Sequence, residues 1–245
     1  IINFKDTDIK VRYEKTISLI DGACDLLKEG GLIFIHGLPK FLPHYATYLN
    51  RKQEDKFYYV FKYWIALEYS PNKLGNILPN SHIGLLMYVK SKDRFQPNGF
   101  HLNTKEVRIP HQKCPSYKKE SKDWGGKNHL RNNLGAAVSD VWSDLYEEWD
   151  SINELPPKAI DRLYELVYFD KMQFLVIGQN KLNIKKPASI NSNSNHEVKD
   201  LEIKEDILLA DSIEYMEKLH KKYPNGVFDL VFADPPYNLA KNYNG

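Results

Sequence analysis

The chain has 245 residues, of which 42% are hydrophobic, and a formal net charge of +2. This length allows one large domain or two small ones, and the near-neutral charge neither requires nor forbids a nucleic-acid partner. No apolar run is long enough to span a membrane, no signal-peptide pattern opens the chain, and two cysteines cannot form a disulfide framework. These features exclude membrane-spanning and disulfide-rich classes and predict a protein of the reducing cytoplasm.

The first ninety residues have the pattern of helices alternating with apolar strands. Residues 12–28 carry apolar side chains at three- and four-residue spacing, which predicts a helix, and Gly30-Gly31 is expected to end it. Further elements are expected from apolar and aromatic content: a strand at 32–36, a helix at 41–50, and strands at 57–67 and 82–89. A helix followed by glycines and an apolar strand is half of a βαβ crossover, which predicts an α/β fold.

The middle of the chain is polar, and residues 91–135 are expected to be rich in loops. The stretch 105–131 is strongly basic, with Lys105, Arg108, Lys113, Lys118, Lys119, Lys122, Lys127 and Arg131. Such a run is either a solvated surface or a set of phosphate contacts, which position a protein on DNA without reading its sequence.

The last third of the chain ends in the pattern of a parallel strand–helix–strand unit. It follows a predicted helix at 157–167, a predicted strand at 174–177, and a linker at 179–200 that contains a tract of Ser and Asn. The unit itself is expected to comprise a strand at 206–210, a helix from Asp211 to about Lys222, and a strand at 228–233. Ligands of parallel sheets bind at the carboxyl ends of strands, where Asp211 and Asp234 are expected to lie.

The strand at 228–233 runs directly into Asp234-Pro235-Pro236-Tyr237. Two prolines remove two backbone donors and fix two φ angles, so Asp234 is expected in a rigid, extended turn with the Pro235 carbonyl free to accept. Two acceptors on the hydrogens of an amino group conjugated to a base favour a pyramidal nitrogen whose lone pair points at a methyl donor. Tyr237 can stack on the base, which must first leave the duplex. The alternative is an ordinary turn after a buried strand.

The segment 232–239 resembles the catalytic motif of the DNA N6-adenine/N4-cytosine amino-methyltransferases, in particular the group whose motif precedes its target-recognition region. Residues 208–212 are similar to that family's opening strand and acidic residue. The resemblance implies a Rossmann-like α/β sheet with a loop-rich target-recognition insertion, S-adenosylmethionine as cofactor and double-stranded DNA as substrate. It implies a catalytic role for Asp234, Pro235, Pro236 and Tyr237, and cofactor contacts for Asp211 and Asn238.

The front of the chain resembles other parts of the same family. Residues 26–37 are similar to the helix and strand that follow the catalytic motif, and residues 80–90, with Trp64, are similar to the strands that close the catalytic half. Residues 122–127 and 139–142 resemble the target-recognition region. We therefore expect three parts: 1–178, with target recognition at about 91–150; the linker; and 201–245. The expected DNA contacts are Lys122, Trp124, Lys127 and Arg131. No metal site is expected, because His111, Cys114 and His129 are too scattered to define one.

The chain departs from this family in two respects. The catalytic motif comes last instead of first, and joining Gly245 to Ile1 would read almost without a seam, so we expect a truncated, tandem or circularly permuted enzyme. The strand at 31–37 is expected in the same parallel sheet as the strand at 227–233. The second departure is the cofactor loop: where the family has Phe-x-Gly-x-Gly, only Gly178 follows the strand at 174–177.

Three functions remain open from the sequence. The first is methylation of DNA at adenine N6, which Asp-Pro-Pro-Tyr favours by family habit, with cytosine N4 as the other acceptor and a restriction endonuclease as a companion. The second is a DNA-binding remnant that has lost its cofactor loop. The third is methylation of an RNA base or a protein amide, although such enzymes more often begin the motif with Asn.

Overall fold

The computed structural model describes residues 9–54, 56–69, 81–97, 100–109, 111, 132–145, 155–177 and 211–233. The helices are α1 (Ile9–Asp25), α2 (Leu42–Arg51), α3 (Pro157–Val167) and α4 (Ser212–Lys222). The strands are β1 (Leu27–Gly37), β2 (Gln53–Glu54), β3 (Phe57–Glu68), β4 (His82–Ser91), β5 (Arg108–Ile109), β6 (Ala136–Ala137), β7 (Val141–Trp142), β8 (Phe174–Ile177) and β9 (Phe228–Ala233).

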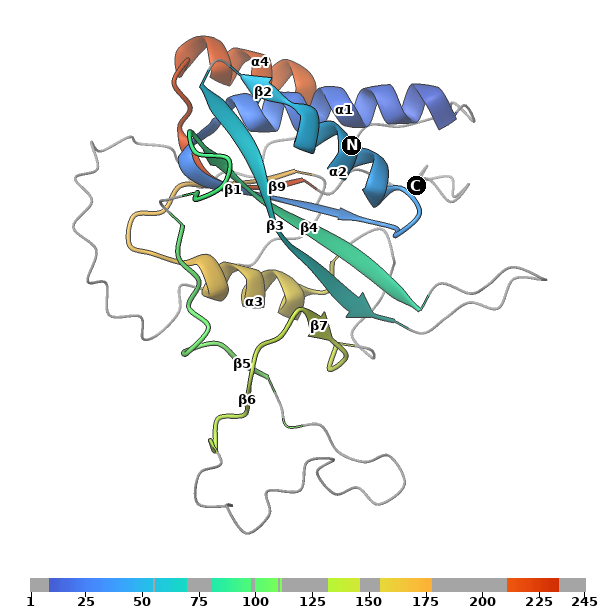
Figure 1. The fold of residues 1–245 in the computed structure, drawn as a ribbon, viewed down its shortest axis with the longest axis vertical. Helices are drawn as coiled ribbons and strands as arrows, with labels where there is room; N and C mark the ends of the chain where they lie inside the picture. The colour runs from blue at the N-terminus through green and yellow to red at the C-terminus, as the bar shows by residue number, and fades with distance from the viewer. Residues whose placement is uncertain are drawn as a thin grey trace.

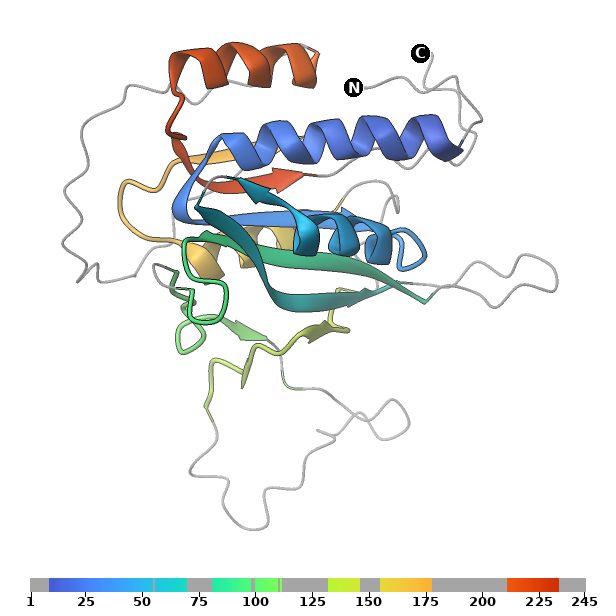
Figure 2. The same cartoon turned by 45° about the horizontal axis from the view of Figure 1, so that its top comes forward.

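These elements form three layers, with a mixed sheet between helices (Figures 1 and 2). In the part of the chain that is described, the sheet has seven strands in the order β2-β3-β4-β1-β9-β8, with β7 beside β3. Strands β1, β9 and β8 are parallel, whereas β4 runs antiparallel to both β1 and β3. A mixed sheet covered by helices on both faces is the expected Rossmann-like arrangement, so the predicted fold class is confirmed.

Each face of the sheet has its own hydrophobic core. Helices α1, α2 and α4 cover one face, where Ile20, Leu49 and Met216 pack against the strands. Helix α3 covers the other face, where Leu163 packs with Phe232 of β9. The strand β9 contributes side chains to both cores, because successive residues of a strand point to opposite faces.

Most of the predicted elements are confirmed to within two residues at each end. They are the helices at 41–50, 157–167 and 212–222 and the strands at 57–67, 82–89, 174–177 and 228–233. The predicted strand at 206–210 lies outside the described residues. Short strands β5, β6 and β7, of two residues each, were not expected from the sequence.

The predicted end of the first helix was wrong. Helix α1 ends at Asp25, and β1 already begins at Leu27, before Gly30 and Gly31. The cause is a tertiary contact: the Leu26 carbonyl accepts hydrogen bonds from the backbone N–H groups of Val227 and Phe228. The chain after Asp25 therefore joins the sheet beside β9. The glycines instead lie in an irregularity of β1 between Leu27 and Leu32, where Gly30 has a φ of +80°.

The expectation that the front and back of the chain share one parallel sheet is confirmed. Strand β9 lies between β1 and β8, with Ile33 opposite Val231 on one side and Leu175 opposite Val231 on the other. Helix α4 lies between the parallel strands β8 and β9 in the chain, and parallel neighbours need a long connection of this kind.

The turn that leads into β9 depends on Gly226. Its φ is +80°, and a Cβ built there would lie 2.5 Å from the carbonyl oxygen of Leu27. We expect Gly226→Ala to lower the free energy of unfolding by about 2 kcal/mol or more, because a left-handed conformation and a backbone clash combine. Urea denaturation measures this, with exposed Asn225→Ala as a control expected within about 0.5 kcal/mol of the wild type. Equal stability of the two variants would contradict the prediction.

Candidate active site

The three parallel strands end at one edge of the sheet. Ala233, the last residue of β9, lies opposite Ile35 of β1 and Ile177 of β8. The predicted catalytic residues Asp234, Pro235, Pro236 and Tyr237, with Asn238, follow Ala233 directly and lie outside the described residues. In sequence, the motif therefore follows directly on the carboxyl end of a central parallel strand, and ligands of such sheets bind at these strand ends.

At the opposite, amino edge, Asp229 fixes the position of β9. Its carboxylate accepts from Lys28 Nζ of β1, 3.1 Å from each oxygen, and from the backbone N–H of Gln173 at 3.0 Å. The Asp229 N–H in turn donates to the Gln173 carbonyl oxygen at 2.9 Å. One residue thus ties β9 to both neighbouring strands, five positions before Asp234.

The structure gives Asp211, predicted to bind the cofactor, a local role as well. It precedes α4, and its Oδ1 accepts from the backbone N–H groups of Ile213 at 3.0 Å and Glu214 at 3.1 Å. This is an N-terminal cap, a role for which aspartate is among the preferred residues. Asp211 is exposed, and both cap bonds use Oδ1, so capping does not require Oδ2. The start of α4 lies on the side of the sheet toward which β9 runs (Figure 1).

Two substitutions separate the cap from cofactor binding. We expect Asp211→Ala to lower the free energy of unfolding by about 1 kcal/mol and Asp211→Ser to change it by only a few tenths, since serine also caps helices. If the carboxylate also holds the adenosine part of S-adenosylmethionine, both variants should weaken binding about tenfold, because hydrogen bonds to a charged group are strong. Calorimetric titration with S-adenosylmethionine measures the second effect. If Asp211→Ser bound S-adenosylmethionine with unchanged affinity, Asp211 would act only as the N-terminal cap of α4.

The other predicted site residues are not brought together by the described structure. Lys122, Trp124, Lys127 and Arg131, predicted to contact DNA, lie outside the described residues, as do Cys114 and His129. Within the described part of the chain, no group of three or more His, Cys, Asp or Glu side chains is placed to hold a metal ion.

The segment after β6, assigned to the target-recognition region, is built into the body of the fold. Trp142 is fully buried, and its Nε1 donates to the Ser139 carbonyl at 2.7 Å. The guanidinium of Arg162, on α3, lies 4.8 Å from the centre of the Trp142 ring and bonds both carboxylate oxygens of Asp144. A bidentate pair of this kind fixes orientation as well as charge.

The segment before β5 is fixed to the same helix. The Asn103 side chain donates to the Glu165 and Tyr168 carbonyls, both at 2.9 Å, and its backbone N–H donates to the Leu166 carbonyl. The segment 103–144, which includes β5 and β6, is therefore bound to α3 at both its ends, and we call it the recognition excursion. The sequence held one signal for this: Arg162 falls three residues after Ala159 and four before Leu166, on an apolar helix face, where an arginine needs an acidic partner.

A second polar cluster lies where α1 and α2 end. Lys52 bonds Asp21 at 2.8 Å and also pairs with Glu54, to which the Tyr59 hydroxyl donates at 2.8 Å. Burial opposes the ionisation of Glu54, but the bonds from Lys52 and Tyr59 outweigh it and lower its pKa. Burial also raises the pKa of the nearby Cys24 thiol far above its usual value, so this thiol is unreactive. Because Lys52, Asp21 and Glu54 pair with one another, we assign this cluster a structural role and no catalytic one.

No family model matches the sequence. The chain is 36% identical over 151 residues to the type II methyltransferase M.BamHI of Bacillus amyloliquefaciens, a match that covers 59% of this chain and 33% of that protein. The chain is thus similar to a type II methyltransferase. The predicted family resemblance is therefore confirmed, and the chain spans about a third of the length of the methyltransferase that it matches.

None of the helices in the described ranges is long and apolar enough to cross a bilayer. Among the described residues, the exposed Asp211 carboxylate before α4 is an acceptor of the kind that the adenosine part of S-adenosylmethionine would need.

Proposed function

We propose that this protein transfers a methyl group from S-adenosylmethionine to an exocyclic amino group of a base in double-stranded DNA. Adenine N6 is the first candidate acceptor and cytosine N4 the second. The observation that carries the proposal is the position of β9, which lies between β1 and β8 so that Asp234 follows the carboxyl end of a central parallel strand. The 36% identity to a type II methyltransferase supports the same reading.

Each motif residue has a distinct task in this proposal. The Asp234 carboxylate and the Pro235 carbonyl accept hydrogen bonds from the two amino hydrogens, and they orient the nitrogen lone pair. Pro236 keeps the turn rigid, and Tyr237 stacks on the base after it has left the duplex. The cofactor, when bound, supplies a methyl group that its sulfonium already activates, so the protein's main contribution is alignment.

The described contacts explain how this alignment is kept. Asp229 fixes the register of β9 against β1 and β8, and the two cores hold both faces of the strand. A reacting group must be held to a fraction of an ångström, and sites supported by rigid elements meet that requirement better than free loops do. Asp211 and Asn238 are proposed to hold the cofactor at the same edge.

Transfer of labelled methyl from S-adenosylmethionine tests the function. The purified chain is incubated with unmethylated plasmid DNA, total RNA or denatured protein, and the labelled product is digested and separated by chromatography. Label in N6-methyladenine or N4-methylcytosine from the plasmid is the expected result, and it also identifies the acceptor base. Label confined to RNA or protein would replace the proposed substrate.

A different outcome favours the second candidate, a DNA-binding remnant. This candidate is supported by the single glycine, Gly178, that follows β8 where the family has a glycine-rich loop. Folded protein that binds plasmid DNA but neither binds S-adenosylmethionine nor transfers its methyl group would establish the remnant. If plasmid DNA is methylated, a restriction endonuclease that cuts the same sequence is the expected partner, and the modified plasmid should resist it.

A further inference from the structure

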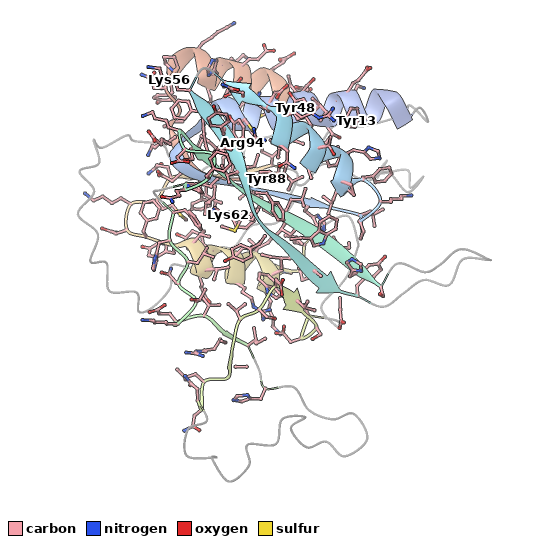
Figure 3. The ribbon with its side chains drawn as sticks, viewed as in Figure 1. Tyr13, Tyr48, Lys56, Lys62, Tyr88 and Arg94 are labelled. Atoms are coloured by element: carbon pink, nitrogen blue, oxygen red, sulfur yellow. The ribbon has the colours of Figure 1, made fainter. Side chains whose placement is uncertain are left out.

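An exposed aromatic surface lies between α1 and α2 and includes none of the predicted catalytic or cofactor residues. It consists of Tyr13 on α1 and of Lys40, Phe41 and His44 around the start of α2, and we call it the α1–α2 surface. Tyr13 is 36% exposed, and its ring stacks on that of Tyr45 with 6.1 Å between centroids and 7° between planes. The His44 ring meets Tyr13 edge-on at 6.3 Å. Figure 3 shows Tyr13 where α1 passes α2.

The α1–α2 surface lies at the same edge of the sheet as the end of β9. Strand β1 ends at Gly37, two residues after Ile35, which faces Ala233. The chain then turns, with the Phe41 N–H donating to the Leu38 carbonyl at 2.9 Å, and enters α2. Lys40 and Phe41 therefore follow the carboxyl end of β1 after a short turn, at the edge where Asp234 directly follows β9 in sequence.

The chemistry of this surface suits a nucleic-acid strand. From Gly37 to Lys52 the sequence contains no Asp or Glu but does contain Lys40, His44 and Arg51. The Lys40 ammonium lies 4.8 Å from the centre of the half-buried Phe41 ring, so a cation and an aromatic ring are adjacent. Proteins that hold unpaired strands combine positive charge, which attracts phosphates, with aromatic rings on which bases stack.

The platform beneath the exposed ring is rigid. Tyr45 is only 6% exposed and belongs to the core that α1 and α2 share. Burial raises the pKa of Tyr45, so it stays a neutral ring. A ring fixed in this way loses little freedom when a base stacks above it, whereas a free side chain would have to be ordered first.

We propose that the α1–α2 surface binds the DNA strand from which the target base is displaced, with Tyr13 and His44 stacking against bases and Lys40 pairing with a phosphate. This inference rests on the proposed function for the presence of DNA at this edge.

Fluorescence anisotropy with a labelled single-stranded oligonucleotide and its duplex, without cofactor, tests the inference. Tyr13→Ala is expected to weaken single-strand binding about tenfold, since each stacked base contributes substantially to affinity. Tyr13→Phe keeps the ring and should stay within about twofold of the wild type. Lys40→Ala should weaken binding and reduce its dependence on salt, because one phosphate contact is lost.

A matched control distinguishes the surface from aromatic exposure in general. Tyr63, on β3, is 43% exposed, and Tyr63→Ala should leave affinity unchanged. Equal affinities of Tyr13→Ala and Tyr63→Ala, with unchanged circular dichroism, would overturn the inference. If Tyr13→Ala fails to fold, the exposed His44→Ala variant answers the same question, and unchanged affinity in that variant also overturns it.

The same measurements separate this inference from the proposed function. Wild-type protein that binds the oligonucleotide through Tyr13 but transfers no methyl group would support the surface and contradict the function. Methyl transfer that Tyr13→Ala and His44→Ala leave unchanged in both rate and KM for DNA would support the function and contradict the surface.

Discussion

Asp234→Ala is expected to lower the single-turnover rate of methyl transfer at least about a hundredfold, with little change in DNA affinity. The carboxylate accepts an amino hydrogen as the nitrogen becomes pyramidal, so its bond strengthens in the transition state and its loss reduces the rate more than binding. Loss of one preorganised hydrogen-bonding partner at a reacting centre typically costs a factor of this size. The measurement is rapid-quench transfer of labelled methyl with enzyme in excess over DNA.

Two further variants make the result specific to Asp234. Asp234→Asn keeps the shape and one acceptor oxygen, so it should retain more activity than Asp234→Ala but less than the wild type. Glu217→Ala removes an exposed carboxylate from α4 and should leave the rate unchanged. Removal of a hydrogen-bonding group at a reacting centre normally lowers the rate far more than about threefold. If Asp234→Ala kept the wild-type rate within that factor, the proposed catalytic role would be wrong.

The parts of the fold that were predicted correctly are those with a strong local pattern. The helix at 157–167 buries Ile160, Leu163 and Leu166 on one face, and its periodicity alone identifies it. The strand at 228–233 is short, apolar and followed by two prolines, which leave no other assignment.

The parts that were missed are set by tertiary contacts. The helical pattern predicted for 12–28 includes Leu27, but pairing with β9 places Leu27 in the sheet, and α1 ends at Asp25. No local pattern records this, because the partner Phe228 lies two hundred residues away in sequence. The two-residue strand β7 likewise exists only because Val141 and Trp142 meet β3.

The candidate site shows the same division. Asp234 to Tyr237 is contiguous in sequence, so a catalytic role can be predicted for it without a structure. The contact of Arg162 with Asp144 and the stacking of Tyr13 on Tyr45 join residues far apart along the chain, and no spacing rule predicts them. Asp211 lies between the two cases: its position before a helix predicts a cap, and the cap then has to be separated from cofactor binding by experiment.

Val231→Asp is expected to lower the free energy of unfolding by about 4 kcal/mol or more, which is enough to unfold the described sheet as a whole. Val231 is fully buried in the core between α1 and the strands, opposite Ile33 and Leu175. An unpaired carboxylate at such a place carries a large desolvation cost, and the total stability of a domain is small by comparison. Urea denaturation followed by both circular dichroism and tryptophan fluorescence measures the loss.

Val141→Asp supplies the matched control, because Val141 is 46% exposed on β7 and the same substitution there should cost little. The comparison decides how the chain is organised. If β9 is integral to the sheet, Val231→Asp removes the buried environment of Trp142 on the opposite face, and both signals are lost together. If residues 9–177 kept their structure and Trp142 stayed buried, the strand that precedes Asp234 would belong to a separate unit. The catalytic motif would then act on a sheet other than the one that α3 and the recognition excursion share, and the alignment proposed here for methyl transfer could not operate within one chain.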